Sequence, residues 1–206
     1  MNDRSPIIYV VDDDASIRRA MTLLLKAHAF RVETFSCAEE FLSFRHPRIP
    51  ACLLLDVRLP GLNGPTLQDI MAERKLFIPI VFITGHGNIP MGVKAMKQGA
   101  VDFLPKPFTE KDLLSAVERA IERSKTRNKE SAEVAQIKQR INTLSPKELE
   151  VFHLVAKGML NKQIASKRGT SLQTIKVHRG RVMHKIQAKT VTELIRFAQK
   201  AGIVSS

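Results

Sequence analysis

The 206-residue sequence has only two cysteines and no long apolar run. Cys37 and Cys52 lack CxxC spacing and have no histidine cluster nearby, which argues against a cysteine metal or redox centre and favours buried packing in a reducing compartment. No stretch approaches the roughly 18 uninterrupted apolar residues of a transmembrane helix. The polar start, Met1 to Arg4, precedes no apolar stretch of signal-peptide length. We therefore expect a cytoplasmic protein without membrane contact.

Acidic residues are scarce in the last two fifths of the chain. Residues 125–206 hold 17 Lys+Arg and 5 Asp+Glu, a net charge of +12, whereas residues 1–124 hold 16 and 15, a net charge of +1. A near-neutral front half joined to a strongly basic back half indicates a nucleic-acid surface behind a regulatory or catalytic module. From charge alone, the alternative is a basic linker without a ligand.

The first half alternates apolar runs with segments of helical periodicity. The expected strands are Ile7–Val11, Arg31–Phe35, Ala51–Leu55, Pro79–Ile83 and Val101–Leu104. The expected helices between and after them are Ala15–Ala29, Cys37–Arg45, Pro65–Arg74, Ile89–Gln98 and a last one that Thr109 caps. Three strands are unbroken apolar runs, as in strands buried on both faces. The pattern predicts an α/β doubly wound (βα)₅ parallel sheet, flavodoxin-like, of about 120 residues.

The segment after this fold continues the helical pattern. Between two apolar stripes, Ser124 to Ser131 is polar and charged, with neither glycine nor proline to break a helix. It is either a flexible hinge or part of one helix from Glu110 to about Arg140, and the missing breakers favour the helix.

Four short helices fit the remainder, as a small all-α domain. Ser145-Pro146-Lys147-Glu148 is a capping box. Asn161 is expected to cap a second helix through Arg168, Ser171 a third at Leu172–Ile186, and Thr190 opens the fourth. A short helix, a turn with glycine and a longer basic helix form a helix-turn-helix arrangement. The expected domains are residues 1–122 and 143–206, joined by a helical linker at 123–142.

Five polar residues stand at or just past the ends of apolar runs: Asp12, Asp13, Asp56, Thr84 and Lys106. If the runs are parallel strands, these groups meet in the crevice outside the carboxyl ends of the strands. Three carboxylates in one crevice repel one another unless a cation lies between them. Carboxylate oxygens are hard ligands, which select magnesium or a similar ion. The lysine and the hydroxyl then complete a cage suited to a transferring phosphoryl group.

Several strings occur in the order of a known family. YVVDDDASIRRAM, the apolar run before Asp56 and FITGHGNIPMGVKAMKQGAVDFLPKPF are followed by LNKQIA and TIKVHRGRVMHKI. Together they resemble a two-component response regulator of the FixJ type, in which a receiver domain precedes a LuxR/GerE-type helix-turn-helix domain. The resemblance covers almost the whole chain.

The resemblance implies roles for the front-half residues. Asp56 would be the phosphoacceptor, with Asp13, Asp56 and the backbone carbonyl of Arg58 binding Mg²⁺ or Mn²⁺, and Asp12 acting mostly through water. Lys106, aimed by a cis bond to Pro107, would bind the acyl-phosphate oxygen. The hydroxyl of Thr84 would turn onto the phosphoryl group and Phe103 would swing inward. The alternative for Phe103 is a core residue.

In the second half, the third helix is expected in the major groove. Leu172, Ile175, Val182 and Ile186 recur at helical spacing and should face the core. Lys176 and Val177 are candidates for base edges. The candidates for phosphate contacts are Lys162, Gln163, Arg181 and Lys185. The full set of expected DNA-contacting residues is Lys162, Gln163, Thr174, Lys176, Val177, Arg179, Arg181 and Lys185. The alternative is a basic, solvated helix face.

Residue 168 departs from the family pattern. The pattern usually has an apolar residue near this position, where this chain has Arg168. Burying an unpaired guanidinium would be expensive, so Arg168 must extend to solvent or find an acid.

These features predict a transcription regulator and not an enzyme, beyond self-phosphorylation from a phosphodonor and slow self-dephosphorylation. Its expected partners are a sensor histidine kinase, double-stranded DNA, RNA polymerase and, on phosphorylation, a second copy of the chain. One alternative is an aspartyl-phosphate phosphohydrolase, since Asp12 and Asp14 have the nucleophile–acid spacing of such enzymes. Another is a DNA-binding regulator with an unphosphorylated receiver.

Overall fold

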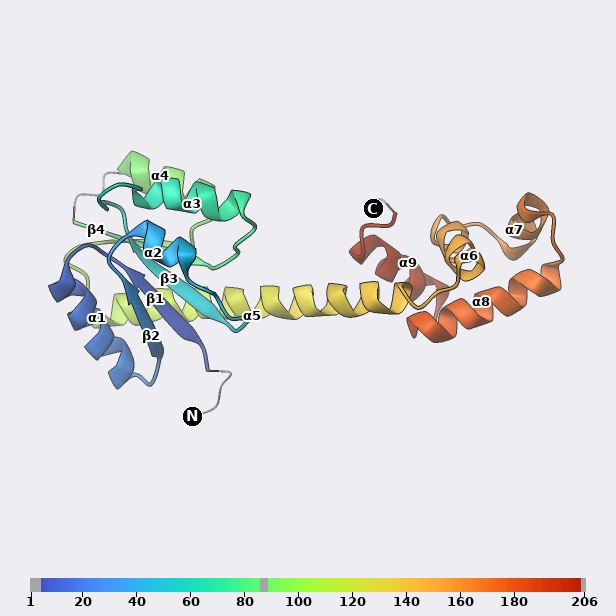
Figure 1. Ribbon diagram of the computed structural model, residues 1–206, viewed down its shortest axis with the longest axis horizontal. Coiled ribbons are helices and arrows are strands. Elements are labelled where there is room, and N and C mark those ends of the chain that lie inside the picture. Colours follow the sequence, from blue (N-terminus) through green and yellow to red (C-terminus); the bar gives the residue numbers. More distant parts are fainter. Residues whose placement is uncertain (1–4, 86–88, 205–206) are drawn as a thin grey trace. The chain divides into compact units, whose positions relative to one another are not determined.

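A computed structural model describes residues 5–85 and 89–204 (Figure 1). The chain forms two compact units that divide between Asn128 and Lys129. The division falls within one helix, α5, so each unit contains part of that helix.

The first unit is a five-stranded parallel sheet with helices between successive strands. Its elements are β1 (Ile7–Val11), α1 (Ala15–Ala27), β2 (Arg31–Phe35), α2 (Ala38–Ser43), β3 (Ala51–Asp56), α3 (Gly64–Glu73), β4 (Ile80–Thr84), α4 (Ile89–Lys97), β5 (Asp102–Pro105) and the start of α5 (Glu110–Ile141). The strand order is β2-β1-β3-β4-β5, with all neighbours parallel. The predicted doubly wound fold is confirmed.

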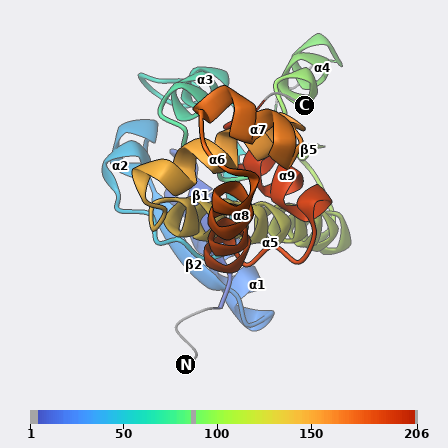
Figure 2. The same cartoon turned by 90° about the vertical axis from the view of Figure 1, so that its right-hand side faces the viewer.

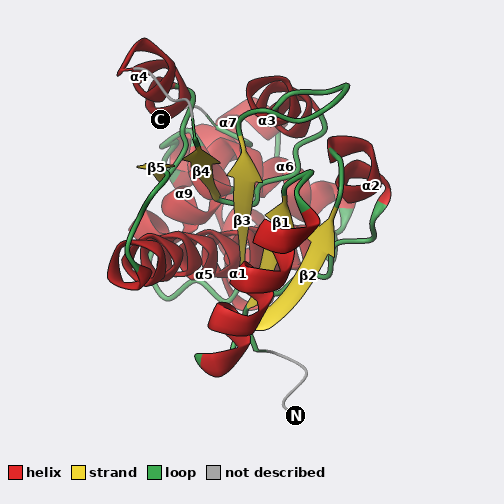
Figure 3. Ribbon diagram, turned by 90° about the vertical axis from the view of Figure 1, so that its left-hand side faces the viewer, coloured by secondary structure: helices red, strands yellow, loops and turns green. Residues whose placement is uncertain are grey.

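Helices cover both faces of the sheet (Figure 3). The alternation of side chains along the strands therefore divides the core of this unit into two layers. On one face, Tyr9 and Leu53 pack with Phe41 of α2 and Leu67 of α3. On the other face, the helices are α1 and α5. Because both faces of the sheet are covered, the central strands β1, β3 and β4 read as continuous or nearly continuous apolar runs in the sequence.

Helix α5 is continuous from Glu110 to Ile141, which confirms the helical alternative for residues 124–131. The hydroxyl of Thr109 accepts a hydrogen bond from the backbone N–H of Asp112, as expected of a cap. The buried Ser124 hydroxyl accepts from Ala51 N–H, at the start of β3. Ile137 belongs to the core of the second unit.

The second unit adds four helices to the end of α5: α6 (Pro146–Ala156), α7 (Asn161–Arg168), α8 (Leu172–Ile186) and α9 (Val191–Lys200), all labelled in Figure 2. The capping box is confirmed: Glu148 N–H donates to Ser145 Oγ at 3.4 Å, and Glu148 Oε2 accepts from Ser145 N–H at 2.8 Å. Gly169 ends α7 with φ of +58°, a conformation that glycine adopts at little cost. The predicted helix-turn-helix arrangement is therefore present.

Two expectations about this unit are wrong in detail. Leu160, not Asn161, stands at the cap of α7, and the cap is completed by Gln163, whose Oε1 accepts from Leu160 N–H. Leu172 is 43 % exposed and does not face the core. As the first residue of α8 it lies beyond the packed turns, and Ile175 is the first fully buried residue of that helix.

Arg168 forms an ion pair with an acidic residue, as predicted for a charged residue at this position. Its Nη2 lies 2.8 Å from Glu150 Oε2, and its Nη1 donates to the Lys147 carbonyl oxygen at 3.2 Å. The charged residue is thus accommodated between α6 and α7 without an unpaired buried charge. Across the described part of the chain, no helix is both long enough and apolar enough to span a membrane.

Candidate metal site and nucleic-acid interface

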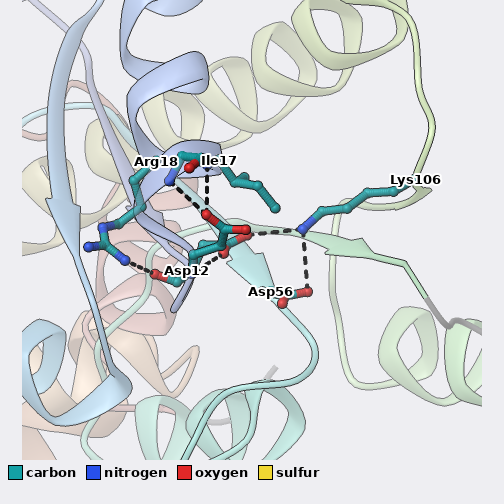
Figure 4. Close-up of polar contacts among 7 residues, drawn as sticks. Asp12, Ile17, Arg18, Asp56 and Lys106 are labelled. Atoms are coloured by element: carbon teal, nitrogen blue, oxygen red, sulfur yellow. Dashed lines mark hydrogen bonds and ion pairs between the residues drawn. The ribbon is translucent and has the colours of Figure 1, made fainter.

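The ends of the parallel strands bring the predicted polar residues together. Asp56 is the last residue of β3 and Thr84 the last of β4, and these strands pair in register through Asp56 and Ile83. Asp12 and Asp13 follow β1 directly, and Lys106 follows β5. Figure 4 shows the Lys106 side chain extending toward Asp12 and Asp56. The topology therefore collects residues from four strands at one edge of the sheet.

Three carboxylates in this crevice are close enough to share a cation. The ligand oxygens of Asp12, Asp13 and Asp56 all lie within 4.8 Å of one another. Lys106 Nζ lies 3.0 Å from Asp12 Oδ2 and 4.0 Å from Asp56 Oδ1. Against three carboxylates one ammonium leaves an excess of negative charge, so the donor set fits a hard divalent cation such as Mg²⁺ or Mn²⁺.

Backbone contacts hold the carboxylates in place. Asp12 is 2 % exposed, and its Oδ1 accepts from the backbone N–H of Asp14 at 2.9 Å. Arg18 Nη1 donates to the Asp12 carbonyl oxygen at 2.7 Å (Figure 4). Asp14 caps α1, since its Oδ1 accepts from Ser16 N–H at 2.7 Å. The three consecutive acidic residues therefore have different roles: Asp12 and Asp13 face the crevice, and Asp14 caps α1.

Burial raises the pKa of Asp56 above its ordinary value; the Lys106 ammonium lowers it and the Asp12 carboxylate raises it further. In this crevice, without a cation, the charged form of Asp56 is disfavoured. A divalent cation would favour that charged form, which is the nucleophilic one.

Thr84 and Phe103, the residues expected to move on phosphorylation, lie on the neighbouring strands β4 and β5. The Lys106–Pro107 bond is cis, as expected, and Lys106 N–H donates to the Thr84 carbonyl oxygen at 2.7 Å. Thr84 is 1 % exposed. The Phe103 ring is half-buried and packs against Gly92 of α4, where a Cβ atom would lie 3.4 Å from Cδ1 of the ring. Arg58 is exposed in the loop after β3.

Two residues of the site were missed by sequence reasoning. Arg18 holds the Asp12 backbone in place, but its position in the helical pattern does not indicate this contact. Gly64 opens α3 so close to β3 that a Cβ atom there would lie 2.6 Å from the Asp56 carbonyl oxygen. The sequence identified Gly64 only as a turn residue, because the close approach involves an element eight residues away.

Most of the expected nucleic-acid contacts are exposed on α7 and α8. The exposed members are Lys162, Gln163, Thr174, Lys176, Val177 and Arg181. Ser171 caps α8 by accepting from Thr174 N–H at 3.0 Å. Val177 is 44 % exposed on the same helix. These residues form an exposed face that combines cationic, amide and apolar groups.

Arg179 and Lys185 are directed inward, contrary to the expected outer position. Arg179 Nη1 donates to Asn161 Oδ1 at 2.5 Å, and Lys185 Nζ lies 2.6 Å from Glu148 Oε2. Both follow buried residues of α8 by three or four positions, so they stand at the edge of the buried stripe. Their partners on α7 and α6 hold them against the unit.

Comparison with known families accounts for both units. The family described as "Response regulator receiver domain" matches residues 8–118, and "Bacterial regulatory proteins, luxR family" matches residues 142–198. The first match contains the carboxylate crevice. The second contains the helix-turn-helix arrangement.

Similar proteins extend over nearly the whole chain. Nodulation protein W of Bradyrhizobium diazoefficiens is 47 % identical over 197 residues, which cover 96 % of this chain and 87 % of that protein. Transcriptional regulatory protein FixJ of the same organism is 40 % identical over 96 % of this chain and 97 % of its own length. The low-resolution structure of the response regulator StyR is 42 % identical, with a TM-score of 0.81 over 95 % of this chain and 99 % of its own. The chain belongs to the response regulators of the FixJ and nodulation protein W type, in which a receiver domain precedes a LuxR-family DNA-binding domain.

Proposed function

We propose that Asp56 accepts a phosphoryl group from a phosphohistidine of a sensor histidine kinase, and that this phosphorylation promotes DNA binding as a dimer. The observation that carries the proposal is the convergence of Asp12, Asp13 and Asp56 within 4.8 Å, with the Lys106 ammonium beside them. Such a site combines a nucleophilic carboxylate with a fixed positive charge.

Each residue has a distinct task in this reaction. A carboxylate oxygen of Asp56 attacks phosphorus while the phosphorus–nitrogen bond to the donor imidazole breaks, which forms an acyl phosphate. Asp12, Asp13, Asp56 and the Arg58 carbonyl would hold Mg²⁺ or Mn²⁺, which offsets charge on the transferring group. Lys106, already close to Asp56, would bind a phosphoryl oxygen. The reaction needs positioning and electrostatics more than covalent help from other side chains.

The response would spread through β4 and β5. The Thr84 hydroxyl would turn toward the phosphoryl group, and the Phe103 ring would move inward into the space vacated. Because Phe103 packs on Gly92, its movement would alter the contact between β5 and α4. Two copies of the chain would then dimerise through the surface of α4, β5 and α5. The dimer would place two DNA-binding units on a DNA site with two-fold symmetry. There, in the cytoplasm, the protein would contact RNA polymerase.

The domain limits belong to the same proposal. Residues 1–122 would form the receiver domain and residues 143–206 the DNA-binding domain, with 123–142 as a helical linker. The continuity of α5 through residues 124–131 supports a linker of this kind.

A phosphohydrolase would need a general acid two residues after its nucleophile. The carboxylate of Asp14 instead caps α1 through the Ser16 and Ile17 N–H groups, which lower its pKa. An acid held in this way, with a lowered pKa, is a poor proton donor at neutral pH.

The direct test is to incubate the full chain with Mg²⁺ and a small phosphodonor and to measure its mass. The proposal predicts a lasting gain of one phosphoryl group, which a chelator prevents. Rapid consumption of the donor without a lasting gain would indicate a phosphohydrolase. No gain and no consumption would indicate a receiver that is not phosphorylated.

For the DNA-binding domain, we expect Lys176→Ala to remove a base contact and Arg181→Ala to remove a phosphate contact, so the two substitutions should change DNA binding in different ways. Loss of a base contact costs about 1–3 kcal/mol at the specific site, whereas loss of a phosphate contact lowers the slope of log K against log salt by about one unit. The probes are a duplex enriched from a random pool by the wild-type chain, called the selected duplex, and its scrambled counterpart.

Salt titrations on both duplexes distinguish the two roles. Lys176→Ala should reduce the ratio of specific to non-specific affinity, and Arg181→Ala should preserve that ratio and flatten the salt slope. The opposite pattern would show that the orientation proposed for α8 is wrong.

A further inference from the structure

One glycine of α8, Gly180, has no structural explanation within the second unit. Gly180 lies in the interior of α8, where glycine is the least favourable residue after proline. Its φ is not in the left-handed region, unlike that of Gly169 in the same unit. A Cβ atom built at Gly180 would have no described neighbour within 4 Å outside the backbone of its own helix. Neither conformation nor packing therefore requires glycine here.

The other described helical glycines have internal reasons. Gly64 lies against the backbone of β3, and Gly92 lies against the Phe103 ring. Gly180 instead faces open space on an exposed surface. A glycine with this environment suits a helix whose backbone must closely approach something outside the chain.

The residues around Gly180 on the surface of α8 indicate which kind of partner approaches this helix. Gln173, Val177, Gly180 and His184 are spaced four, three and four residues apart, so they form one ridge on the exposed face of α8. Cationic side chains flank this ridge, with Lys176 on one side and Arg181 on the other. The ridge itself carries no permanent charge. An uncharged ridge beside Lys176 and Arg181 fits a DNA groove, whose floor presents base edges to the ridge and to Lys176 and whose wall presents phosphates to Arg181.

We infer that Gly180 lets α8 sit deep in the major groove, and that Gln173, on the same ridge as the expected base contact Val177, reads a base there. A glutamine side chain can pair with the two major-groove groups of adenine, and valine can contact a thymine methyl group. Both lie toward the N-terminus of α8, the end that contacts base edges in helix-turn-helix proteins. The inference rests on the proposed DNA-binding function and deepens it.

Substitution of Gly180 should change stability and binding in opposite directions. Gly180→Ala should raise the unfolding midpoint of the DNA-binding unit by about 4 °C, because alanine favours the helix. It should nevertheless weaken binding to the selected duplex by a few-fold. Gly180→Leu should weaken that binding at least ten-fold, with a much smaller effect on the scrambled duplex. The control is Ala135→Leu, which adds three of the same four side-chain carbons at an exposed position of α5.

The measurements are affinity for both duplexes and hydrogen-exchange protection of α8, on full-length variants. Loss of specific binding with retained or increased protection of α8 supports the inference. Wild-type affinity in Gly180→Leu, or an equal loss in Ala135→Leu, overturns it and leaves the proposed function intact. Failure of the wild-type chain to enrich any duplex would contradict the proposed function itself.

Discussion

Asp56→Asn should abolish phosphoryl uptake completely without unfolding the receiver domain. The substitution preserves the shape of the side chain and removes both the nucleophile and one negative charge from the crevice. The mass of the full chain after incubation with Mg²⁺ and a phosphodonor measures the effect. Undiminished labelling would move the acceptor elsewhere, with Asp12 or Asp13 next in position.

The same variant should be at least as stable as the wild type in the absence of a divalent cation. Because burial raises the pKa of Asp56 in the folded protein, its contribution to stability is fully present below its ordinary pKa and is lost as the pH rises through the folded value. Above that folded value the wild type carries a destabilising charge, which the neutral amide of the variant removes. A marked destabilisation of the variant at pH 7 without metal would contradict this electrostatic account.

The second large effect is expected at the ion pair between Glu148 and Lys185. The Glu148 side chain is only 5 % exposed, and its carboxylate accepts from both Lys185 Nζ and the Ser145 N–H. Glu148→Gln would leave the ammonium without its counter-ion and weaken the cap of α6. Because Lys185 is still 37 % exposed, solvent screens the pair, and we expect a loss of roughly 2 kcal/mol, below the value for fully buried pairs.

The pH dependence of this pair has a defined sign. The Lys185 ammonium, followed by the Ser145 N–H, lowers the pKa of Glu148 from 4.5 to about 2. The stabilisation is therefore fully present above about pH 4.5 and is lost as the pH falls through about 2. Glu148→Gln should remove this dependence.

Hydrogen exchange in α6 and α8 is the suitable measurement for Glu148→Gln, because the chain has no tryptophan and its single tyrosine, Tyr9, lies in the other unit. The control is Glu133→Gln, which removes a pair with Lys200 that solvent screens more strongly and should therefore have a much smaller effect on protection. Equal effects of the two substitutions would contradict a special role for Glu148.

This ion pair also changes the expectation for Lys185 and DNA. Sequence periodicity placed Lys185 on the outer face as a phosphate contact, whereas its ammonium contacts Glu148 and the Thr143 carbonyl oxygen. Lys185→Ala should therefore destabilise the unit as well as alter DNA binding. Its salt slope can be interpreted only together with its stability.

The sequence was most informative where local chemistry determines structure. Continuous apolar runs located three of the five strands. The polar residues at or just past the strand ends located the crevice, because parallel strands end at the same edge. The Ser145 capping box and the missing helix breakers near Ser124 were likewise local signals. Each depends on residues a few positions apart, so one sequence is enough to recognise them.

The sequence was least informative where partners come from distant segments. Arg179 pairs with Asn161, 18 residues away, and Lys185 pairs with Glu148, 37 residues away. Helical spacing places both basic residues at the edge of the buried stripe, where the position of a neighbouring helix decides their direction. The exposure of Leu172 has the same origin, since α8 meets the core only from Ile175 onward.

The central claim is that phosphorylation of Asp56 controls DNA binding. The measurement is the affinity of the full chain for the selected duplex with and without Mg²⁺ and a phosphodonor, for the wild type and for Asp56→Asn. Since coupling between two sites typically amounts to about 5- to 150-fold in affinity, we expect the wild type to bind at least five-fold more tightly after treatment and the variant to remain unchanged. An equal response of both proteins, or phosphorylation of the wild type without any change in affinity, would contradict the claim.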